Sequence, residues 1–332
     1  NDDSSELMQI NHAAGKHPVC VHPDLFELIE LGKKHSLAPD SHLNITLGPL
    51  IQTWRIGFAD AKVPSPEEIK QALSLTDPEF IELDATASSV FLTMEGMKID
   101  LGALAKGYIA DKIAAFLRSQ GVTSALINLG GNILTIGLNE KNNRCWRIGI
   151  QNPTLPRGNN LALLSVQNQS VVTSGIYERK LQVDGRVYHH IFDRTTGYPI
   201  NNQLASLTIV SSKSVDGEIW TTRLFGESPT SILEKVEQEH GIEAFVITEN
   251  HQIFYLVSAQ KSYPKSRKEP TMLKFIGLVG TNSKKSTNRQ LLQYMQKHFA
   301  DKAEIELIEI KDIPIFNKPA DMQVPEIVKE IA

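Results

Sequence analysis

The sequence is poor in cysteine and has no long apolar run. Its 332 residues include two cysteines, Cys20 and Cys145, which lie far apart and form no CxxC pair. We therefore expect neither structural disulfides nor a zinc site, and a reducing compartment, the cytoplasm, is favoured. No apolar run approaches the roughly 20 residues of a membrane-spanning helix, and no charged segment followed by an apolar stretch opens the chain. We expect no membrane span, although a start without methionine leaves room for a removed leading segment.

The composition is that of an ordinary globular protein. A net charge of −4 gives no basic surplus for binding nucleic acid, and 41% hydrophobic residues over this length allow about two domains. The clearest break is the stretch 258–271, which is polar, basic and carries two prolines, as is typical of an exposed linker. We therefore expect a first domain over residues 1–258, a linker over 259–271 and a second segment over 272–332.

The first domain mixes helical and extended patterns without regular alternation. Apolar spacing and end signals predict helices over 23–34, 66–73 and 103–120, and Ser65 with Glu68 forms a capping box before the second. Short β-type runs follow at 125–128, 133–136, 146–150, 163–167, 181–183, 187–192 and 207–210. This combination indicates an α+β domain with mixed sheets and helices.

The second segment has a different pattern. A strand-like run from Leu273 leads into a polar loop, an amphipathic stretch over 290–299 and another strand-like run over 305–310. This order predicts the opening of an α/β domain with a parallel sheet. The segment is about one third as long as a doubly wound domain.

The stretch Ile99 to Tyr108 places charged groups at the start of a helix. Free backbone N–H groups at such a start favour an anion or a phosphate, and Asp100 and Lys106 lie on either side of that start. Asp100 is then a ligand or a cap, and Lys106 is placed to face a phosphate. A capping aspartate and an exposed helical lysine explain the same residues without a ligand.

The stretch Asn128 to Asn132 puts two glycines directly after a strand-like run. Such glycines permit either close approach of the backbone to a ligand or a plain tight turn. The pattern is not GxGxxG, and no acidic residue follows at the distance typical of a Rossmann fold, so NAD bound in that manner is not expected.

His190 and Asp216 are the candidates for reacting and metal-binding groups. His190 ends a strand-like run just before a turn, a position that holds an imidazole rigidly, and its neighbour His189 must face the other side of the strand. Asp216 precedes a run that can begin a helix, where it is either a carboxylate ligand of Mg²⁺ or a helix cap.

Five segments in one order carry a resemblance to a known family. They are Asn44–Trp54, Ile99–Tyr108, Asn128–Asn132, Val172–Gly175 and His190–Pro199. Through them, residues 1–257 resemble the FAD:protein FMN transferase family, also called ApbE-like. The resemblance implies a Mg²⁺-dependent enzyme that cleaves FAD, leaves FMN as a phosphoester on a threonine or serine of an acceptor protein, and releases AMP.

The resemblance also implies roles for single residues. The FAD contacts that it implies are Trp54, Arg55, Ile56, Asp100, Lys106 and His190. The metal ligands are the carbonyl of Ala103 and the carboxylate of Asp216, which we also count as catalytic. We expect His190 to be the base that activates the incoming hydroxyl, since its unperturbed pKa is about 6.5, with Asp193 as an orienting partner.

The chain departs from the family pattern in three places. Ile219 and Trp220 stand where the family has a small polar or acidic residue and a threonine, which leaves the metal site incomplete unless Thr221 or Glu218 compensates. Arg194 replaces a proline in the turn after the histidine. The family's first strand and helix precede the point at which this sequence starts, so we expect that strand and one flavin contact to be missing.

The second segment resembles the NAD(P)H-dependent FMN reductases of flavodoxin-like fold, through Gly280 to Arg289. This resemblance implies that Thr281, Ser286 and Asn288 contact an FMN phosphate, as hydroxyl and amide groups at a helix start do. A polar loop that binds nothing fits the same residues. With about sixty residues of that domain present, reductase activity is not expected.

Three functions therefore stay open on the sequence. The first is FMN transfer to a protein. The second is a flavin-binding module or FAD pyrophosphatase with a decayed metal site, which Ile219 and Trp220 favour. The third is a flavin reductase that acts through the second segment, which the Gly280 loop favours.

Overall fold

The computed structural model describes residues 4–156, 158–239 and 241–256, the strands 273–279 and 303–309, and positions 293, 296 and 297. The expected linker lies outside the described residues, as do Thr281, Ser286 and Asn288, the expected FMN contacts.

The elements alternate irregularly along the chain. The helices are α1 (Glu6–Ala13), α2 (Pro23–Ser36), α3 (Gly48–Trp54), α4 (Pro66–Leu73), the 3₁₀ turn η1 (Pro78–Phe80), α5 (Ala105–Ser119), α6 (Ser214–Leu224) and α7 (Pro229–Gln238). The strands are β1 (Val19–Cys20), β2 (Ile81–Asp84), β3 (Ser89–Leu92), β4 (Ala125–Leu129), β5 (Asn132–Ile136), β6 (Trp146–Gln151), β7 (Asn160–Val166), β8 (Ser170–Gly175), β9 (Lys180–Val183), β10 (Arg186–His189), β11 (Leu204–Ser211), β12 (Ile242–Thr248), β13 (Ile253–Leu256), β14 (Leu273–Val279) and β15 (Ala303–Glu309).

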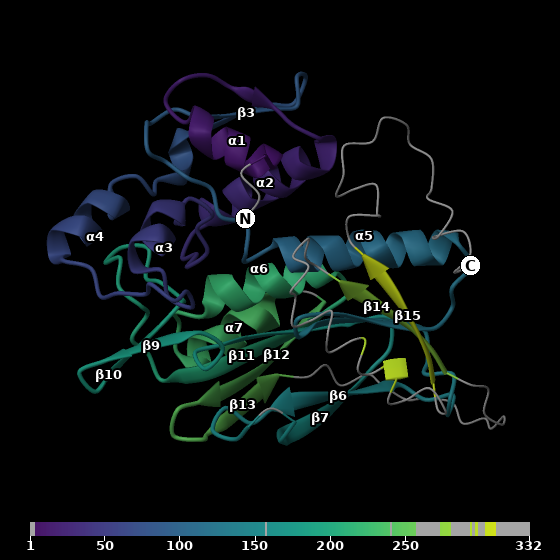
Figure 1. The fold of residues 1–332 in the computed structure, drawn as a ribbon. Helices are drawn as coiled ribbons and strands as arrows, with labels where there is room; N and C mark the ends of the chain where they lie inside the picture. The colour runs from purple at the N-terminus through teal and green to yellow at the C-terminus, as the bar shows by residue number, and fades with distance from the viewer. Residues whose placement is uncertain are drawn as a thin grey trace.

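A six-stranded sheet of order β13-β12-β11-β8-β5-β4 organises the larger part of the fold, and its pairings are antiparallel. Helices α5, α6 and α7 lie on one face, and the β6–β7 hairpin lies on the other (Figure 1). The hairpin contributes Ile148, Ile150 and Val166 to a cluster with residues of β8, β11 and β12. Because it is covered on both faces, the central strand β11 is buried at all of its 8 positions.

Helix α5 joins this sheet to a second group of elements, α1, α2 and the small sheet β1-β3-β2 (Figure 1). Leu104 and Tyr108 pack in the cluster that those elements share. Ile113 and Ala114, on another face of the helix, pack in a cluster with β4 and β5. A helix with apolar residues on two faces is held on both sides, so its first turn is a rigid place for functional groups.

Most of the predicted elements are present, but the start of α5 differs from the prediction. Ser65 and Glu68 form the expected capping box of α4. Helix α5 begins at Ala105 rather than Ala103, and Leu104 occupies its N-cap position without a side-chain bond. Asp100 is not the cap, because its Oδ1 accepts the N–H of Gly102 (2.8 Å) in the turn that precedes the helix.

The described part of the second segment has the predicted parallel pairing. Strands β14 and β15 run side by side in parallel, with Leu273 opposite Ala303. This arrangement requires a crossover connection, and the helix expected over 290–299 lies mostly outside the described residues. Elsewhere in the described residues, no helix combines the length and the apolar character that crossing a membrane requires, and Cys20 and Cys145 are free thiols.

Candidate active site

Three segments that are far apart in the sequence meet at the carboxylate of Glu218. Lys106 Nζ, in the first turn of α5, lies 2.8 Å from Glu218 Oε1 on α6. Asn132 Nδ2, at the start of β5, donates to the same oxygen at 2.8 Å. The Glu218 side chain is only 5% exposed, whereas that of Lys106 is 46% exposed. A buried carboxylate held by an ammonium and an amide therefore lies at the junction of α5, α6 and the β4–β5 turn.

A chain of buried side chains fixes this carboxylate in place. Ser214 Oγ donates to Asn132 Oδ1 (2.6 Å), and Ser170 Oγ lies 3.0 Å from Ser214 Oγ. All three residues are buried. Gly107 lets the two helices approach, since a Cβ there would lie 2.5 Å from the carbonyl oxygen of Ser214. The bond from Ser214 thus orients the Asn132 side chain, so that its NH₂ group points to Glu218.

Asp216, the expected metal ligand, faces a different part of the structure. It lines a cavity of about 360 Å³ together with Asp111, Lys112 and Lys213. Burial raises the pKa of Asp216, while nearby Lys213 lowers it. Asp111 accepts the N–H groups of Ser214 (2.7 Å) and Val215 (2.9 Å), so it caps α6, and burial raises its pKa as well. The described contacts do not bring Asp216 to the Lys106–Glu218 pair.

The oxygen atoms around Glu218 are of the kind that Mg²⁺ prefers. The described residues contain no cluster of three histidine, cysteine, aspartate or glutamate side chains that could hold a metal. A cation here would rely on one carboxylate with hydroxyl and carbonyl oxygens, which is a hard donor set. Thr222 lies one turn after Glu218, and its hydroxyl donates to the Glu218 carbonyl (2.9 Å). Ala103 lies in the turn before α5, whose backbone bonds run from Leu104 and Ala105 to Leu101. By their chemistry, these oxygen donors are of the type that suits Mg²⁺.

The expected flavin contacts Trp54, Arg55 and Ile56 form a turn at the end of α3. The Trp54 indole is fully buried and donates to the carbonyl of Gly197 (3.0 Å), and Ile56 is 4% exposed. Arg55 adopts a left-handed conformation (φ 52°) and pairs with Asp60 at 2.6 Å. The side chains of Trp54 and Ile56 belong to the core, so a ligand at this turn would meet backbone atoms and the half-exposed arginine.

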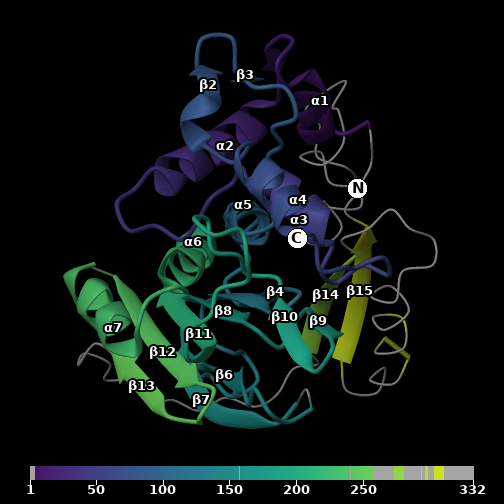
Figure 2. The same ribbon diagram turned by 90° about the vertical axis from the view of Figure 1, so that its left-hand side faces the viewer.

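The same turn is packed against the segment that carries His190. The Trp54 ring contacts Tyr188 and Phe192, with centroids 5.3 Å and 5.9 Å away, and these two residues flank His190 in the sequence. Helices α3 and α4 accordingly lie beside β9 and β10 (Figure 2). The side chain of Arg179 also packs on Gly57. The structure therefore brings His190 and the 54–57 turn together.

A carbonyl beside His190 selects one tautomer of its neutral ring. Its Nδ1 lies 3.2 Å from the carbonyl oxygen of Arg179. A carbonyl can only accept, so Nδ1 carries the proton and Nε2 keeps a free lone pair. Burial lowers the pKa of His190 to about 4. The ring is therefore neutral at neutral pH, Nε2 is its acceptor atom, and it is a weaker base than a free imidazole.

Asp193 does not orient His190. Its Oδ1 instead accepts the N–H (2.7 Å) and the hydroxyl (2.6 Å) of Thr195 and the N–H of Thr196 (3.1 Å). The Arg179 carbonyl takes the orienting place that we expected for Asp193. The strand ends one residue earlier than expected, at His189, which faces inward and bonds the carbonyl of Ile200 (2.8 Å), and His190 follows it.

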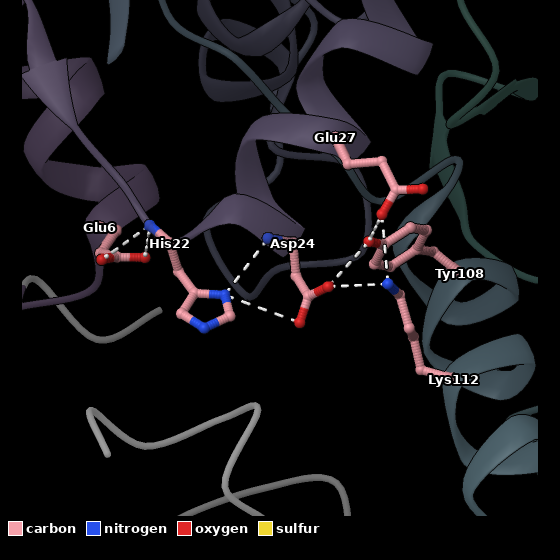
Figure 3. Close-up of polar contacts among 6 residues, drawn as sticks. All are labelled: Glu6, His22, Asp24, Glu27, Tyr108 and Lys112. Carbon is pink, nitrogen blue, oxygen red and sulfur yellow. Dashed lines mark hydrogen bonds and ion pairs between the residues drawn. The ribbon is translucent and has the colours of Figure 1, made fainter. Parts of the chain in front are cut away.

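A second polar cluster lies between α2 and α5 (Figure 3). Lys112 Nζ contacts Asp24 (2.7 Å) and Glu27 (3.1 Å), and the Tyr108 hydroxyl donates to the same two carboxylates. His22 caps α2 by accepting the N–H of Asp24 (3.2 Å). Burial lowers the pKa of Lys112, but its hydrogen bonds with Asp24, Tyr108 and Glu27 together outweigh burial and raise that pKa above its usual value. This cluster links α2 to α5. It thereby stabilises the start of α5, with Asp100 just before the helix and Lys106 in its first turn.

Glu218 is the site residue that the sequence indicated only weakly. The motif pattern suggested Glu218 only as a replacement for a missing ligand, because the pattern is counted from Asp216. It does not show which carboxylate lies on the face of α6 that meets Lys106. Its separation from Lys106 by over a hundred residues gives no local signal of their contact. Only the packing of α5 on α6 brings the two together.

The chain matches known proteins along two stretches. A family model described as the ApbE family matches residues 1–246, and one described as NADPH-dependent FMN reductase matches residues 273–332. An FAD:protein FMN transferase of Klebsiella pneumoniae (strain 342) is 46% identical over 253 residues, which are 76% of this chain and 78% of that protein. Another, of Treponema pallidum (strain Nichols), is 38% identical over 68% of this chain and 66% of that protein.

Solved structures match the first stretch as well. The crystal structure of the ApbE protein of Thermotoga maritima has a TM-score of 0.70 at 28% identity, and the match covers 76% of this chain and 82% of that one. The flavin transferase ApbE of Vibrio cholerae has a TM-score of 0.67 at 25% identity, with coverages of 77% and 82%. The α+β fold and both sequence resemblances are thereby confirmed.

Proposed function

The chain belongs to the ApbE family and is a transferase, and we propose that it uses Mg²⁺ to transfer FMN from FAD to a threonine or serine hydroxyl of an acceptor protein, with release of AMP. The observation that supports this proposal is the meeting of Lys106 and Asn132, from two of the sequence motifs, with Glu218 of α6. A module with a decayed metal site would not need a fixed, buried carboxylate at this junction.

The proposed reaction is one displacement at phosphorus. The acceptor oxygen attacks the FMN phosphorus of FAD, the bond to the AMP oxygen breaks, and AMP leaves. His190 Nε2 takes the proton of the attacking hydroxyl, because its lone pair is free while Nδ1 donates to Arg179. The Nε2–H then returns that proton to solvent or to product.

Glu218 takes the carboxylate role that the sequence analysis gave to Asp216. We propose that Glu218, with the carbonyl of Ala103 and the hydroxyl of Thr222, holds the Mg²⁺ ion. When bound, Mg²⁺ neutralises charge on the diphosphate and stabilises the leaving phosphate of AMP. Asp216 points to the other face of α6 and is assigned to the cavity there.

The other flavin contacts stay as the motifs assign them. Lys106 supplies a positive charge for the phosphates, and Asp100 lies in the turn just before α5. The turn of Trp54, Arg55 and Ile56 contributes its backbone and the arginine side chain, since the indole is buried. We retain domain limits of 1–258 and 272–332, and FMN at Thr281, Ser286 and Asn288, as predictions.

The test is a transfer assay with mass spectrometry. The chain is incubated with FAD, Mg²⁺ and a threonine-containing acceptor protein. The mass of the acceptor is then measured by mass spectrometry. We expect a mass gain equal to FMN less water and one AMP per FMN attached, and EDTA should stop both. Free FMN with AMP and an unmodified acceptor would instead indicate an FAD pyrophosphatase.

A second activity is favoured by one observation. The match of residues 273–332 to the NADPH-dependent FMN reductases coincides with the parallel pairing of β14 and β15. Adding NADPH and free FMN to the same assay tests it, since a reductase would oxidise NADPH without any acceptor protein.

A further inference from the structure

The carboxylate of Glu218 has a side-chain cation beside it in this structure. Lys106 Nζ and Asn132 Nδ2 both bind Oε1 at 2.8 Å. With 5% exposure, the carboxylate has little water to stabilise its charge. The ammonium therefore supplies the positive charge that this buried carboxylate needs.

The two side chains that bind the Glu218 carboxylate, Asn132 and Lys106, differ in how firmly they are held. Asn132 is held by the buried Ser214, which bonds the buried Ser170, so the carboxylate has a fixed amide beside it. Lys106 reaches Glu218 from the first turn of α5 with a side chain that is 46% exposed. A flexible chain with its stem in water can release its ammonium at little cost, because water solvates the freed charge.

A metal ion and Lys106 cannot both be well accommodated on one carboxylate. A divalent ion beside the ammonium would place three positive charges against one negative charge. Their repulsion is strong where water is largely excluded. The ion pair seen here and a metal-bound Glu218 are thus alternative states of the site.

We propose that Lys106 exchanges with the metal: its ammonium neutralises Glu218 when no metal is bound and turns to the flavin phosphates when the metal binds. This inference rests on the proposed function. It adds that metal and FAD bind cooperatively, because phosphates that hold Lys106 away remove the competitor from Glu218. By linkage, the metal raises the affinity for FAD by the same factor.

The experiment measures Mn²⁺ binding without FAD, by electron paramagnetic resonance of the free ion, since Mn²⁺ takes the same oxygen ligands. We expect K106M to bind Mn²⁺ at least tenfold more tightly than the unaltered protein, and K106R, which keeps the charge, to bind as the unaltered protein does. K62M is the matched control, because Lys62 also pairs with a glutamate, Glu68, at 2.6 Å. It should leave the Mn²⁺ affinity unchanged.

Adding FAD gives a second readout. FAD should tighten Mn²⁺ binding to the unaltered protein at least tenfold and to K106M less than twofold. Circular dichroism of each variant checks that it is folded. Equal Mn²⁺ affinities of K106M and the unaltered protein overturn the exchange.

The variant E218Q distinguishes a failure of the Lys106–metal exchange from a failure of the proposed function. If E218Q loses Mn²⁺ while K106M equals the unaltered protein, only the exchange is wrong and the metal role of Glu218 stands. If E218Q binds Mn²⁺ as well as the unaltered protein does, Glu218 holds no metal, and both the exchange and that part of the proposed function are wrong.

Discussion

Asp216 and Glu218 stand two residues apart on α6 and face different surroundings. Glu218 contacts Lys106 and Asn132, whereas Asp216 lines the cavity with Asp111 and Lys213. Since each residue of an α-helix turns by about 100°, two residues turn the side chain by about 200°. The proposed metal role can therefore belong to one of these carboxylates but not to both.

The first prediction compares these two carboxylates. E218Q should lower kcat/KM for FMN transfer about 100-fold or more, because it removes the charged ligand of the metal. D216N should stay within about threefold, because it leaves the Lys106 network intact. Steady-state transfer rates at saturating Mg²⁺ measure both. A large loss in D216N with an active E218Q would return the metal to Asp216.

The second prediction concerns the pH dependence of transfer. Burial lowers the pKa of His190 to about 4, and the neutral ring is the form that accepts a proton. kcat/KM should therefore rise with pH through about 4 and be flat from about pH 5.5 to 8, with no inflection near 6.5. A pH profile at saturating Mg²⁺, in acetate, MES and HEPES buffers of equal ionic strength, measures it. An inflection at 6.5 would mean that the reacting base is an exposed histidine.

His190→Ala tests the same residue at fixed pH. Transfer should fall about 100-fold or more, as expected for loss of a general base. FAD binding, followed by flavin fluorescence, should remain mostly intact, because the other phosphate contacts are unchanged. Retained transfer in this variant would refute the role of His190 as the base.

The third prediction concerns stability in acid. Burial, with Arg223 nearby, lowers the pKa of His35 to about 4, whereas the unfolded chain protonates near 6.5. Between these values the unfolded state binds more protons, so the free energy of unfolding falls as pH falls from about 6.5 to 4. His35→Gln should shrink the loss between pH 7 and pH 5 by roughly 1–2 kcal/mol. Urea unfolding at both pH values measures this, and an unchanged loss would contradict it.

The sequence predicted local structure well where the signal was local. The capping box of Ser65 and Glu68 forms within four residues, and the helix after Gly102 begins within two residues of its expected start. The motifs also marked Lys106 and His190, which both lie in polar surroundings that the structure describes. Such features depend on chemistry between near neighbours in the chain, so one sequence is enough to find them.

Contacts between distant segments could not be predicted in this way. The sequence offered Asp216 because an acidic residue opens a helix, yet the packing of α6 on α5 decides which face meets Lys106. Asp193 was expected at His190, but the nearer donors of Thr195 and Thr196 take its oxygen. Trp54 was expected at the flavin, but its indole is buried against the rings of Tyr188 and Phe192. In each case tertiary packing or a competing local bond decided the outcome.

The last prediction tests the ion cluster between α2 and α5. Lys112 neutralises Asp24 and Glu27, and the Tyr108 hydroxyl bonds both carboxylates (Figure 3). K112M would leave two neighbouring carboxylates without their cation, so it should lower the free energy of unfolding by about 1–2 kcal/mol at pH 7. The loss should shrink toward pH 4, because protonation of the carboxylates removes their repulsion. K62M is the control: it breaks one exposed pair with Glu68 and should cost less than about 0.5 kcal/mol. Urea unfolding of both variants at pH 7 and pH 4 measures the difference, and equal small losses would mean that the cluster does not stabilise the packing of α2 on α5.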